Sequence, residues 1–424
     1  MGLLTQFRTD RRSRFGRNVI RLASANVLGQ ALTLATAPIL TRVYAPSDFA
    51  ALALFSSVVS MLLACATLRF EWSVPNASSR PLAVGAMVHA LLSLAVFCVL
   101  AAALLGPGRH LLSSWNTAQV IGPALLLAPV AVLAGGVQQI LQSWFVREAD
   151  LGPVGRARIS QSVATASLSL ALVPWARGGL IASAALGPWV GLVPLARTQL
   201  PALRRAAHRL SRPRLALAWR RFAKDSLLSS AASLANMAGL TLLPIWLAQH
   251  FSAAEIGWFA LAQRIALAPV GLVSSAVGQG FWAEAARLAR QDRPALRRLY
   301  LRSSARLALL SLPVAAFCLA GPLFMGPVFG KLEWSRAGIL LTALTPMLVS
   351  QLIVSPVSHL VVHRRQSWQM IWDVVRVCLM GLAVVLCARA HLGIAATVFA
   401  VALVAMAMYV VLFFLNLRCL RRSA

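Results

Sequence analysis

The sequence predicts an all-α integral membrane protein with about 12 transmembrane helices. Of its 424 residues, 59% are hydrophobic and only 12% are charged, whereas about a quarter of the residues of a soluble globular domain are charged. The apolar residues form runs of the length needed to cross a hydrocarbon core about 30 Å thick, which takes about 20 helical residues. Most of the surface is therefore expected to face lipid, and a soluble enzyme is excluded.

Twelve runs satisfy this length criterion. They lie at 19–40, 49–68, 82–104, 119–144, 159–175, 179–196, 227–247, 256–280, 303–325, 337–362, 368–388 and 392–416. The first run follows a basic segment, as the apolar part of a signal peptide does. It is longer than that, contains Asn26 and Gln30, and is followed by Thr41 and Arg42 instead of a small-residue cleavage site. We therefore predict an uncleaved first helix.

The basic residues between the spans predict the orientation. With an even number of spans both termini share one side, and 32 of the 40 Lys and Arg residues fall on that side, counting Arg21 and Arg306 at the adjoining ends of their spans, against six on the other. Basic loops stay in the cytoplasm, so we predict that both termini are cytoplasmic. The remaining two, Arg264 and Arg376, lie inside spans.

The net charge of +29 would suggest a nucleic-acid partner in a soluble protein. Here the charge is distributed as expected for loops beside an anionic leaflet, so no nucleic acid is expected. The six cysteines stand singly in or beside apolar runs, without metal-ligand spacing, which predicts no metal site. The two lysines, Lys224 and Lys331, do not follow a glycine-rich phosphate loop. We expect no cofactor and no built-in ATPase.

The two halves of the chain resemble each other. Pro38 and Ile39 at the end of the first span recur 206 residues later as Pro244 and Ile245. An acidic residue follows each pair, and these two residues, Asp48 and Glu255, are 207 residues apart. Six spans per half is an even number, so the repeat is parallel, as in one known transporter arrangement. We predict a six-helix lobe at 1–196, a basic cytoplasmic linker at 197–226 and a second lobe at 227–424. Such a bilobal architecture is expected to hold its cavity between lobes that rock to expose it alternately.

Two segments carry sequence motifs of a known family. The first is 38–49 (PILTRVYAPSDF), followed by 68–71 (LRFE); the second is 251–282, which contains LAQR at 261–264 and GQGFW at 278–282. Both resemble the polysaccharide biosynthesis flippases, the Wzx-type transporters of lipid-linked oligosaccharides in the MOP superfamily. One departure is Ala50, where the family often has glycine, although Gly257 retains it in the second half.

The resemblance implies a MATE/MOP-like fold and a flippase without catalytic residues. Its substrate would be an O-antigen or exopolysaccharide repeat unit linked to undecaprenyl diphosphate. The protein would move it from the cytoplasmic to the periplasmic leaflet of a bacterial inner membrane, with lipid and other polysaccharide assembly proteins as partners. Two alternatives are a multidrug or small-cation exporter of the same superfamily and a membrane enzyme acting on the glycan. The exporter would need acidic intramembrane residues, and the enzyme usually has a long outer loop, which is not predicted here.

A diphosphate needs cationic side chains along its path, because the planar guanidinium pairs with phosphate oxygens. Arg264 has no acidic residue within one turn of its helix, so it is predicted to be either a cavity cation or a partner of carbonyl groups on another helix. Arg376 lies three residues after Asp373, where side chains meet. The pair is either self-neutralised or a coupling carboxylate, Asp373, with a gating arginine.

Three further candidates lie at span ends. Arg69 and Glu71 follow the second span at its cytoplasmic end, where Arg69 is either a membrane anchor or a residue of the cavity mouth, and Glu71 is a candidate coupling residue. Arg42 follows the first span, where it is either an interfacial anchor or a contact for phosphate on exit.

Overall fold

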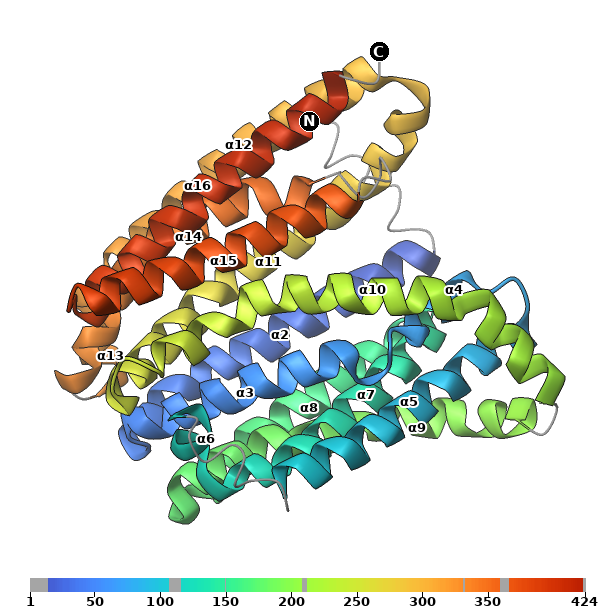
Figure 1. Cartoon of the computed structure of the whole chain (residues 1–424), viewed down its shortest axis with the longest axis horizontal. Helices are drawn as coiled ribbons and strands as arrows, with labels where there is room; N and C mark the ends of the chain where they lie inside the picture. Colours follow the sequence, from blue (N-terminus) through green and yellow to red (C-terminus); the bar gives the residue numbers. More distant parts are fainter. Residues whose placement is uncertain are drawn as a thin grey trace. The chain divides into compact units, whose positions relative to one another are not determined.

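All regular structure in the described part of the chain is helical (Figure 1). Contacts divide the protein into two compact units, Met1–Thr36 with Leu54–Met237, and Ala37–Ala53 with Ala238–Ala424. The computed structural model describes residues 14–106, 116–148, 150–207, 212–330, 332–358 and 366–421.

The first unit holds most of α2 and α3, and the helices that follow as far as the middle of α10. Its elements are α2 (Arg14–Val43), α3 (Pro46–Ala66), the 3₁₀ turn η1 (Phe70–Trp72), α4 (Ser73–Asn76), α5 (Arg80–Leu105), α6 (Asn116–Ile121), η3 (Gly122–Leu127), α7 (Ala128–Arg147), α8 (Gly152–Ala171), η4 (Val173–Trp175), α9 (Ala176–Ala207) and α10 (Arg212–Leu247).

The second unit takes the junction of α2 and α3, the end of α10, and the rest of the chain. Its further elements are α11 (Ala253–Gln291), α12 (Arg293–Leu319), α13 (Gly321–Phe329), η5 (Leu332–Trp334), α14 (Ser335–Val354), η6 (Ser355–Val357), α15 (Gln366–Arg389) and α16 (Ile394–Arg421).

Each predicted span overlaps a described helix, and residues 359–362 of the span predicted at 337–362 lie outside the described residues. Among the described residues, ten helices are long and apolar enough to cross a membrane, and a bent stretch of α10, Leu215–Gly239 with Thr241–Leu247, makes an eleventh. The span predicted at 159–175 corresponds to α8, which is 20 residues long. It is not among these because it carries Arg156, Arg158 and several hydroxyl and amide side chains.

Most of the predicted linker at 197–226 is helical. The helix α9 continues past the end of its span to Ala207, and α10 begins at Arg212, well before the predicted start of the next span. The division between the two units falls after Met237, within α10.

Small residues bring α8 and α9 into close contact. A Cβ atom at Gly187 of α9 would overlap the side chain of Thr165 of α8, and one at Gly191 would lie 3.1 Å from the carbonyl oxygen of Ala157. Helices that pack in lipid commonly meet through such residues because their backbones can approach closely. This packing explains how α8 is held despite its polar composition.

The junction of α2 and α3 is anchored within the second unit by Trp334. The indole nitrogen of Trp334 donates a hydrogen bond of 3.1 Å to the carbonyl oxygen of Thr41, and the Thr41 hydroxyl donates to the carbonyl oxygen of Phe329 at 3.1 Å. Phe49 meets the Trp334 ring edge to face, with centroids 5.1 Å apart. Gly257 on α11 packs so closely on Pro46 that a Cβ atom there would overlap the Pro46 carbonyl group.

The acidic residues of the internal repeat, Asp48 and Glu255, make the same backbone hydrogen bond in the two halves. Asp48 Oδ2 accepts a hydrogen bond of 3.0 Å from the amide nitrogen of Ala45, and Glu255 Oε2 accepts one of 2.9 Å from that of Ser252. Each acid therefore satisfies a backbone donor at the start of the next helix, as in a capping box. The two capped amides are 207 residues apart, as the two acids are.

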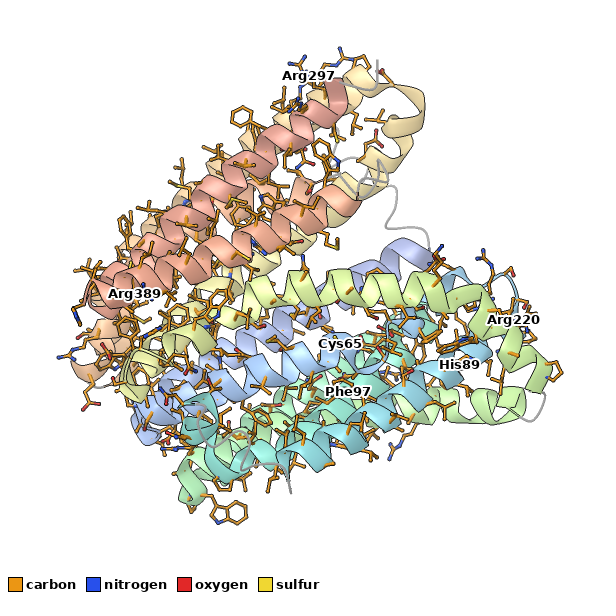
Figure 2. All side chains as sticks on the ribbon, viewed as in Figure 1. Cys65, His89, Phe97, Arg220, Arg297 and Arg389 are labelled. Carbon is orange, nitrogen blue, oxygen red and sulfur yellow. The ribbon has the colours of Figure 1, made fainter. Side chains whose placement is uncertain are left out.

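Large aliphatic side chains cover much of the outer surface. Val99 on α5 and Leu309 on α12 are each 68% exposed, as expected for helices that face lipid. In the second unit, the charged residues Arg297 and Arg389 lie at opposite ends (Figure 2). Apolar helix sides with charged ends are typical of spanning helices.

Candidate functional site

Arg264 is a deep cation without a hydrogen bond or ion pair to the residues that the structure describes. It lies eleven residues after the first residue of α11, Ala253, which is about 16 Å along the helix at 1.5 Å per residue. Its side chain is half-buried and makes no hydrogen bond or ion pair with any residue that the structure describes. An arginine at mid-membrane costs about 2.5–3.5 kcal/mol on insertion scales and usually faces protein or water. Arg264 therefore offers a free positive charge within a span.

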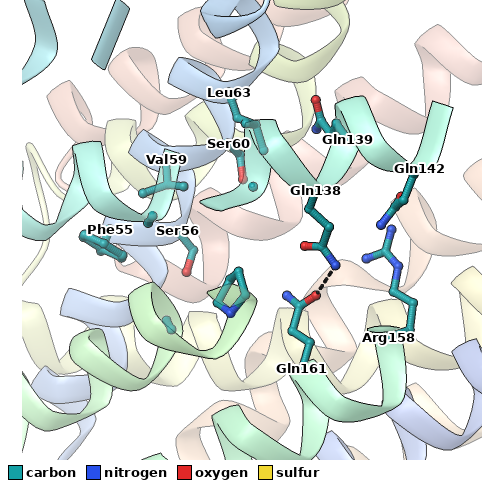
Figure 3. Close-up of a pocket in the computed structure, with 14 residues that line it drawn as sticks. Phe55, Ser56, Val59, Ser60, Leu63, Gln138, Gln139, Gln142, Arg158 and Gln161 are labelled. Atoms are coloured by element: carbon teal, nitrogen blue, oxygen red, sulfur yellow. Dashed lines mark hydrogen bonds between the residues drawn. The ribbon is translucent and has the colours of Figure 1, made fainter. Parts of the chain in front are cut away.

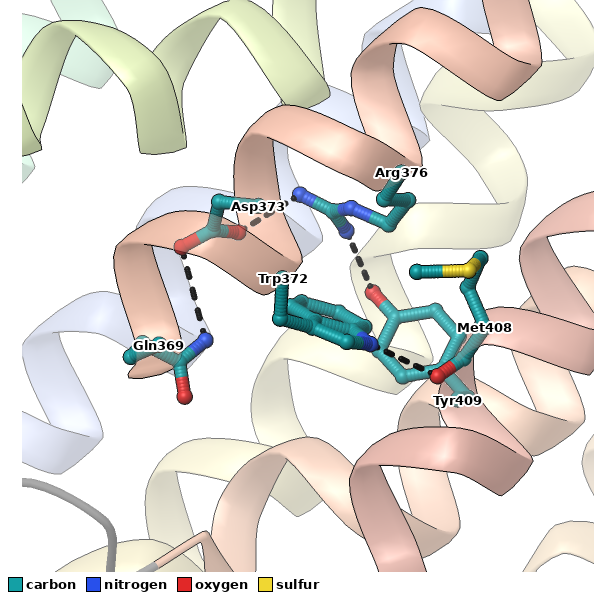
Figure 4. A network of polar contacts seen from close by, with 6 residues as sticks. All are labelled: Gln369, Trp372, Asp373, Arg376, Met408 and Tyr409. Carbon is teal, nitrogen blue, oxygen red and sulfur yellow. Dashed lines mark hydrogen bonds and ion pairs between the residues drawn. The ribbon is translucent and has the colours of Figure 1, made fainter. Parts of the chain in front are cut away.

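Arg376, by contrast, is paired through both terminal nitrogens within the second unit (Figure 4), while its buried Nε has no hydrogen-bond partner among the described residues. Its Nη2 donates to Asp373 Oδ1 at 3.1 Å and its Nη1 to the hydroxyl of Tyr409 at 3.0 Å. The guanidinium carbon lies 4.6 Å from the centroid of the Trp372 ring. Arg376 and Asp373 are 4% and 2% exposed. The geometry is that of an ion pair between two buried side chains of one helix.

The α10 helix also confines this pair. A Cβ atom at Gly239 would overlap the Nη2 atom of Arg376, so the absence of a side chain there gives the guanidinium its space. The ion pair is thus enclosed by α10, α15 and α16.

Arg69 and Glu71 lie in the turn after α3. Arg69 has a left-handed backbone, with φ of 58°, which costs a non-glycine residue roughly 1–2 kcal/mol. Its Nη1 donates to the Ser233 hydroxyl at 2.7 Å, and its guanidinium carbon lies 4.2 Å from the Trp72 ring centroid. Burial lowers the pKa of Arg69, and the charge of Glu71 opposes this.

Glu71 is 5% exposed, and its Oε2 atom has no hydrogen-bond partner in the described part of the chain. Burial raises the pKa of Glu71, and the charge of Arg69 opposes the shift. Glu71 is therefore a carboxyl group that can take up a proton more readily than an exposed glutamate.

Arg42 is an exposed residue of the α2–α3 junction. Its side-chain stem packs on Gly330, where a Cβ atom would lie 2.7 Å from Arg42 Cγ, and Gly330 has a φ of +82°. Arg42, Arg264 and the Arg376–Asp373 pair belong to the second unit, and Arg69 and Glu71 to the first.

The first unit contains a polar cavity of about 270 Å³ that the sequence analysis did not identify (Figure 3). It lies among α3, α7, α8 and α9, and its polar lining includes Gln138, Gln139, Gln142, Arg158 and Gln161. Gln138 Nε2 donates to Gln161 Oε1 at 3.0 Å. Figure 3 shows Arg158 on α8 extending toward Gln142 on α7.

A signal for this cavity exists in the sequence. Gln138, Gln139 and Gln142 stand one and four residues apart in an apolar run, a spacing that puts them near one face of a helix. The span predicted at 159–175 places Arg158 just outside it, in the preceding cytoplasmic loop. The structure begins α8 at Gly152, which places Arg158 about 9 Å along the helix.

Comparison with known proteins gives a family match over most of the chain. Residues 39–337 match the model of a family described as polysaccharide biosynthesis protein. No curated protein matches the chain.

Solved transporter structures have the same fold. An inward-facing multidrug resistance MATE family transporter of the MOP superfamily is 15% identical, with a TM-score of 0.71 over 93% of this chain and 96% of that one. The eukaryotic MATE transporter AtDTX14 is 14% identical, with a TM-score of 0.64 over 97% and 98%. A MOP superfamily transporter from Pyrococcus furiosus is 13% identical, with a TM-score of 0.59 over 97% of both chains. At these identities the matches show the fold, which is that of the MATE and MOP transporters.

Proposed function

The chain belongs to the polysaccharide biosynthesis protein family, and from that premise we propose that it is a flippase for a lipid-linked oligosaccharide. The substrate is an O-antigen or exopolysaccharide repeat unit on undecaprenyl diphosphate. It moves from the cytoplasmic to the periplasmic leaflet of a bacterial inner membrane by alternating access, and both termini of the protein are cytoplasmic. No covalent bond is made or broken in this activity.

The observation that carries the proposal is the unpartnered guanidinium of Arg264. A diphosphate headgroup loses its hydration when it enters the membrane, and a cation within a span compensates for part of that loss. Arginine suits this role because its planar fork binds two phosphate oxygens at once. Arg264 has no hydrogen bond or ion pair among the described residues, so its donors are available to the substrate.

The other candidates receive subsidiary roles. Arg69 is proposed to contact the headgroup on entry and the exposed Arg42 on exit. The two residues follow consecutive predicted spans, which would place them on opposite sides of the membrane. Glu71 is proposed to take part in coupling, since its carboxyl group is buried without a full set of partners. Arg376 and Asp373 are proposed to act together as a neutral structural pair.

The cation-exporter alternative fits the charges less well. Such an exporter needs a free acidic group within a span, whereas Asp373 is bound by Arg376 at 3.1 Å. The Pyrococcus furiosus relative is described as having a binding pocket of reverse polarity that suggests a different function. A free arginine at mid-span likewise favours an anionic substrate for this chain.

The test is deletion of the gene followed by extraction of lipid-linked intermediates. The completed oligosaccharide should accumulate on its lipid carrier and glycan display should be lost. Wild-type protein and the Arg389→Gln variant should restore display, because Arg389 is exposed at the end of α15. Unchanged intermediates together with altered tolerance of cationic drugs would instead establish the exporter.

A further inference from the structure

The polar cavity of the first unit contains hydrogen-bonding groups that the protein does not satisfy. Arg158, Gln139 and Gln142 make no hydrogen bond or ion pair with any residue in the described ranges, and neither do the hydroxyl groups of Ser56 and Ser60 on α3. Arg158 is exposed to the cavity, and both glutamines are partly exposed. Unpaired polar groups among spanning helices are costly unless they meet protein, water or a ligand.

The remaining two amides form a fixed wall. Gln138 is 5% exposed and donates to Gln161. Behind them, a Cβ atom at Gly191 of α9 would lie 3.2 Å from Gln138 Nε2 and 3.1 Å from Gln161 Cβ. The backbone of α9 thus supports the amide pair directly, and side chains held in this way provide a preorganised binding surface.

The free groups define the chemistry of a ligand. A carboxamide both donates and accepts hydrogen bonds and therefore matches a hydroxyl group. A guanidinium matches an anionic oxygen pair. Phe55, buried at 1% exposure, adds an apolar surface beside Ser56. The cavity volume of about 270 Å³ lies near the lower end of small-molecule sites, which run from about 300 to 1,000 Å³, and this suits one sugar ring better than an oligosaccharide.

We propose that this cavity is a subsite for an anionic, hydroxyl-bearing unit of the transported glycan, with Arg158 binding the anionic oxygens and the glutamines of α7 binding hydroxyl groups. The assignment rests on the proposed flippase function and adds a determinant of which glycan is accepted. The anionic oxygens come either from a sugar carboxylate or from phosphate attached to the sugar.

Ligand-induced stabilisation of the purified full-length protein tests the subsite. Thermal unfolding is followed in detergent with sodium glucuronate, glucose or sodium phosphate at matched ionic strength. Glucuronate is expected to raise the unfolding temperature more than glucose does. In Arg158→Gln its apparent affinity should fall at least about tenfold, because a hydrogen bond to a charged group is lost. The matched control is Arg156→Gln, which removes an exposed arginine of the same helix that does not line the cavity.

A second variant keeps the test independent of one residue. The double variant Gln139→Leu, Gln142→Leu leaves Arg158 in place and should also weaken glucuronate binding. A shift with phosphate alone that Arg158→Gln abolishes assigns the anion to a phosphate and supports the subsite. Equal shifts with glucose and glucuronate, no shift in the wild-type protein, or equal effects of Arg158→Gln and Arg156→Gln would overturn it.

Complementation in cells separates this proposal from the flippase function. If the subsite contributes to acceptance of the glycan, Arg158→Gln should lower display while the lipid-linked intermediate accumulates. Normal display in Arg158→Gln, with display still lost on deletion of the gene, would refute the subsite and leave the flippase intact. Absence of accumulation on deletion would refute the flippase itself, whatever the binding result.

Discussion

Asp373 Oδ1 and Arg376 Nη2 lie 3.1 Å apart, one turn from each other on α15, with both side chains almost fully buried. The pair has polar and aromatic neighbours, since Tyr409 accepts a hydrogen bond from Arg376 and the Trp372 ring lies beside the guanidinium. The attraction between the two charges offsets part of the desolvation cost of burying each of them. The charge of Arg376 is in this way neutralised by an aspartate of its own helix.

Removing one member of this pair should strongly destabilise the protein. Asp373→Asn leaves a buried guanidinium without its counter-charge, a change that typically costs about 3–5 kcal/mol. The double variant Asp373→Asn, Arg376→Gln should recover much of this loss, as measured by thermal unfolding in detergent. It should also retain glycan display; a stable double variant without display would instead assign the pair a coupling role.

Arg264 should respond differently, because it has no hydrogen bond or ion pair in the described part of the chain to lose. We expect Arg264→Gln to insert and unfold as the wild type does while transport falls by about one to two orders of magnitude, the value of a charged hydrogen bond. Arg264→Lys keeps the charge but not the planar fork, so its transport should lie between that of the wild type and that of Arg264→Gln. Display of surface glycan and the level of the lipid-linked intermediate measure the effect. Full display with Arg264→Gln would remove Arg264 from the proposed path.

Glu71 should make stability depend on pH. Because burial raises the pKa of Glu71 above its ordinary value of 4.5, the folded protein binds this proton more tightly than the unfolded chain. Its contribution is fully present below the ordinary pKa and is lost as pH rises through the raised pKa.

Glu71→Gln should abolish this pH-dependent contribution to stability. At pH values above the raised pKa of Glu71, the variant should be more stable than the wild type. Unfolding temperatures measured from about pH 4 to about pH 8 test it. Glu333→Gln, at an exposed position, is the control, and parallel profiles for Glu71→Gln and the wild type would contradict the assignment.

Gly257 should not tolerate a side chain. The Cβ atom of Gly257→Ala overlaps the carbonyl group of Pro46, and overpacking of this kind typically costs about 1–3 kcal/mol. Gly178→Ala is the matched helical control, since no atom lies within 4 Å of its added Cβ. Equal unfolding temperatures for the two variants would show that α11 can move away from Pro46 without cost.

The repeat was predictable where it has a local function. Asp48 and Glu255 could be paired from the sequence because each caps the helix that begins just before it, so the signal lies within four residues. The span positions were predictable for the same reason, since hydropathy is a property of a continuous segment. The helix α8 was also predicted, at 159–175, but its start at Gly152 was not, because arginines and polar side chains lower the hydropathy of its first turns.

The candidate site was only partly predictable. The sequence identified Arg264, Arg376 and Asp373 as charges inside spans, but left open which charges are free. The contacts with Tyr409 on α16 and with Gly239 on α10 show how closely Arg376 is enclosed. The cavity around Arg158 was not predicted, because it is lined by four helices whose polar residues lie far apart along the chain.

By itself the sequence determined that this protein is a helical membrane protein, where its helices run and that it carries intramembrane arginines, because each of these follows from the composition of a single segment. Tertiary structure decided that the junction of α2 and α3 packs on Trp334, that Asp373 neutralises Arg376 while no described residue pairs with Arg264, and that the glutamines of α7 face Arg158. Each of these depends on which helices pack together, and the free energy of a charge or an amide in a membrane is set by the groups that other helices place around it.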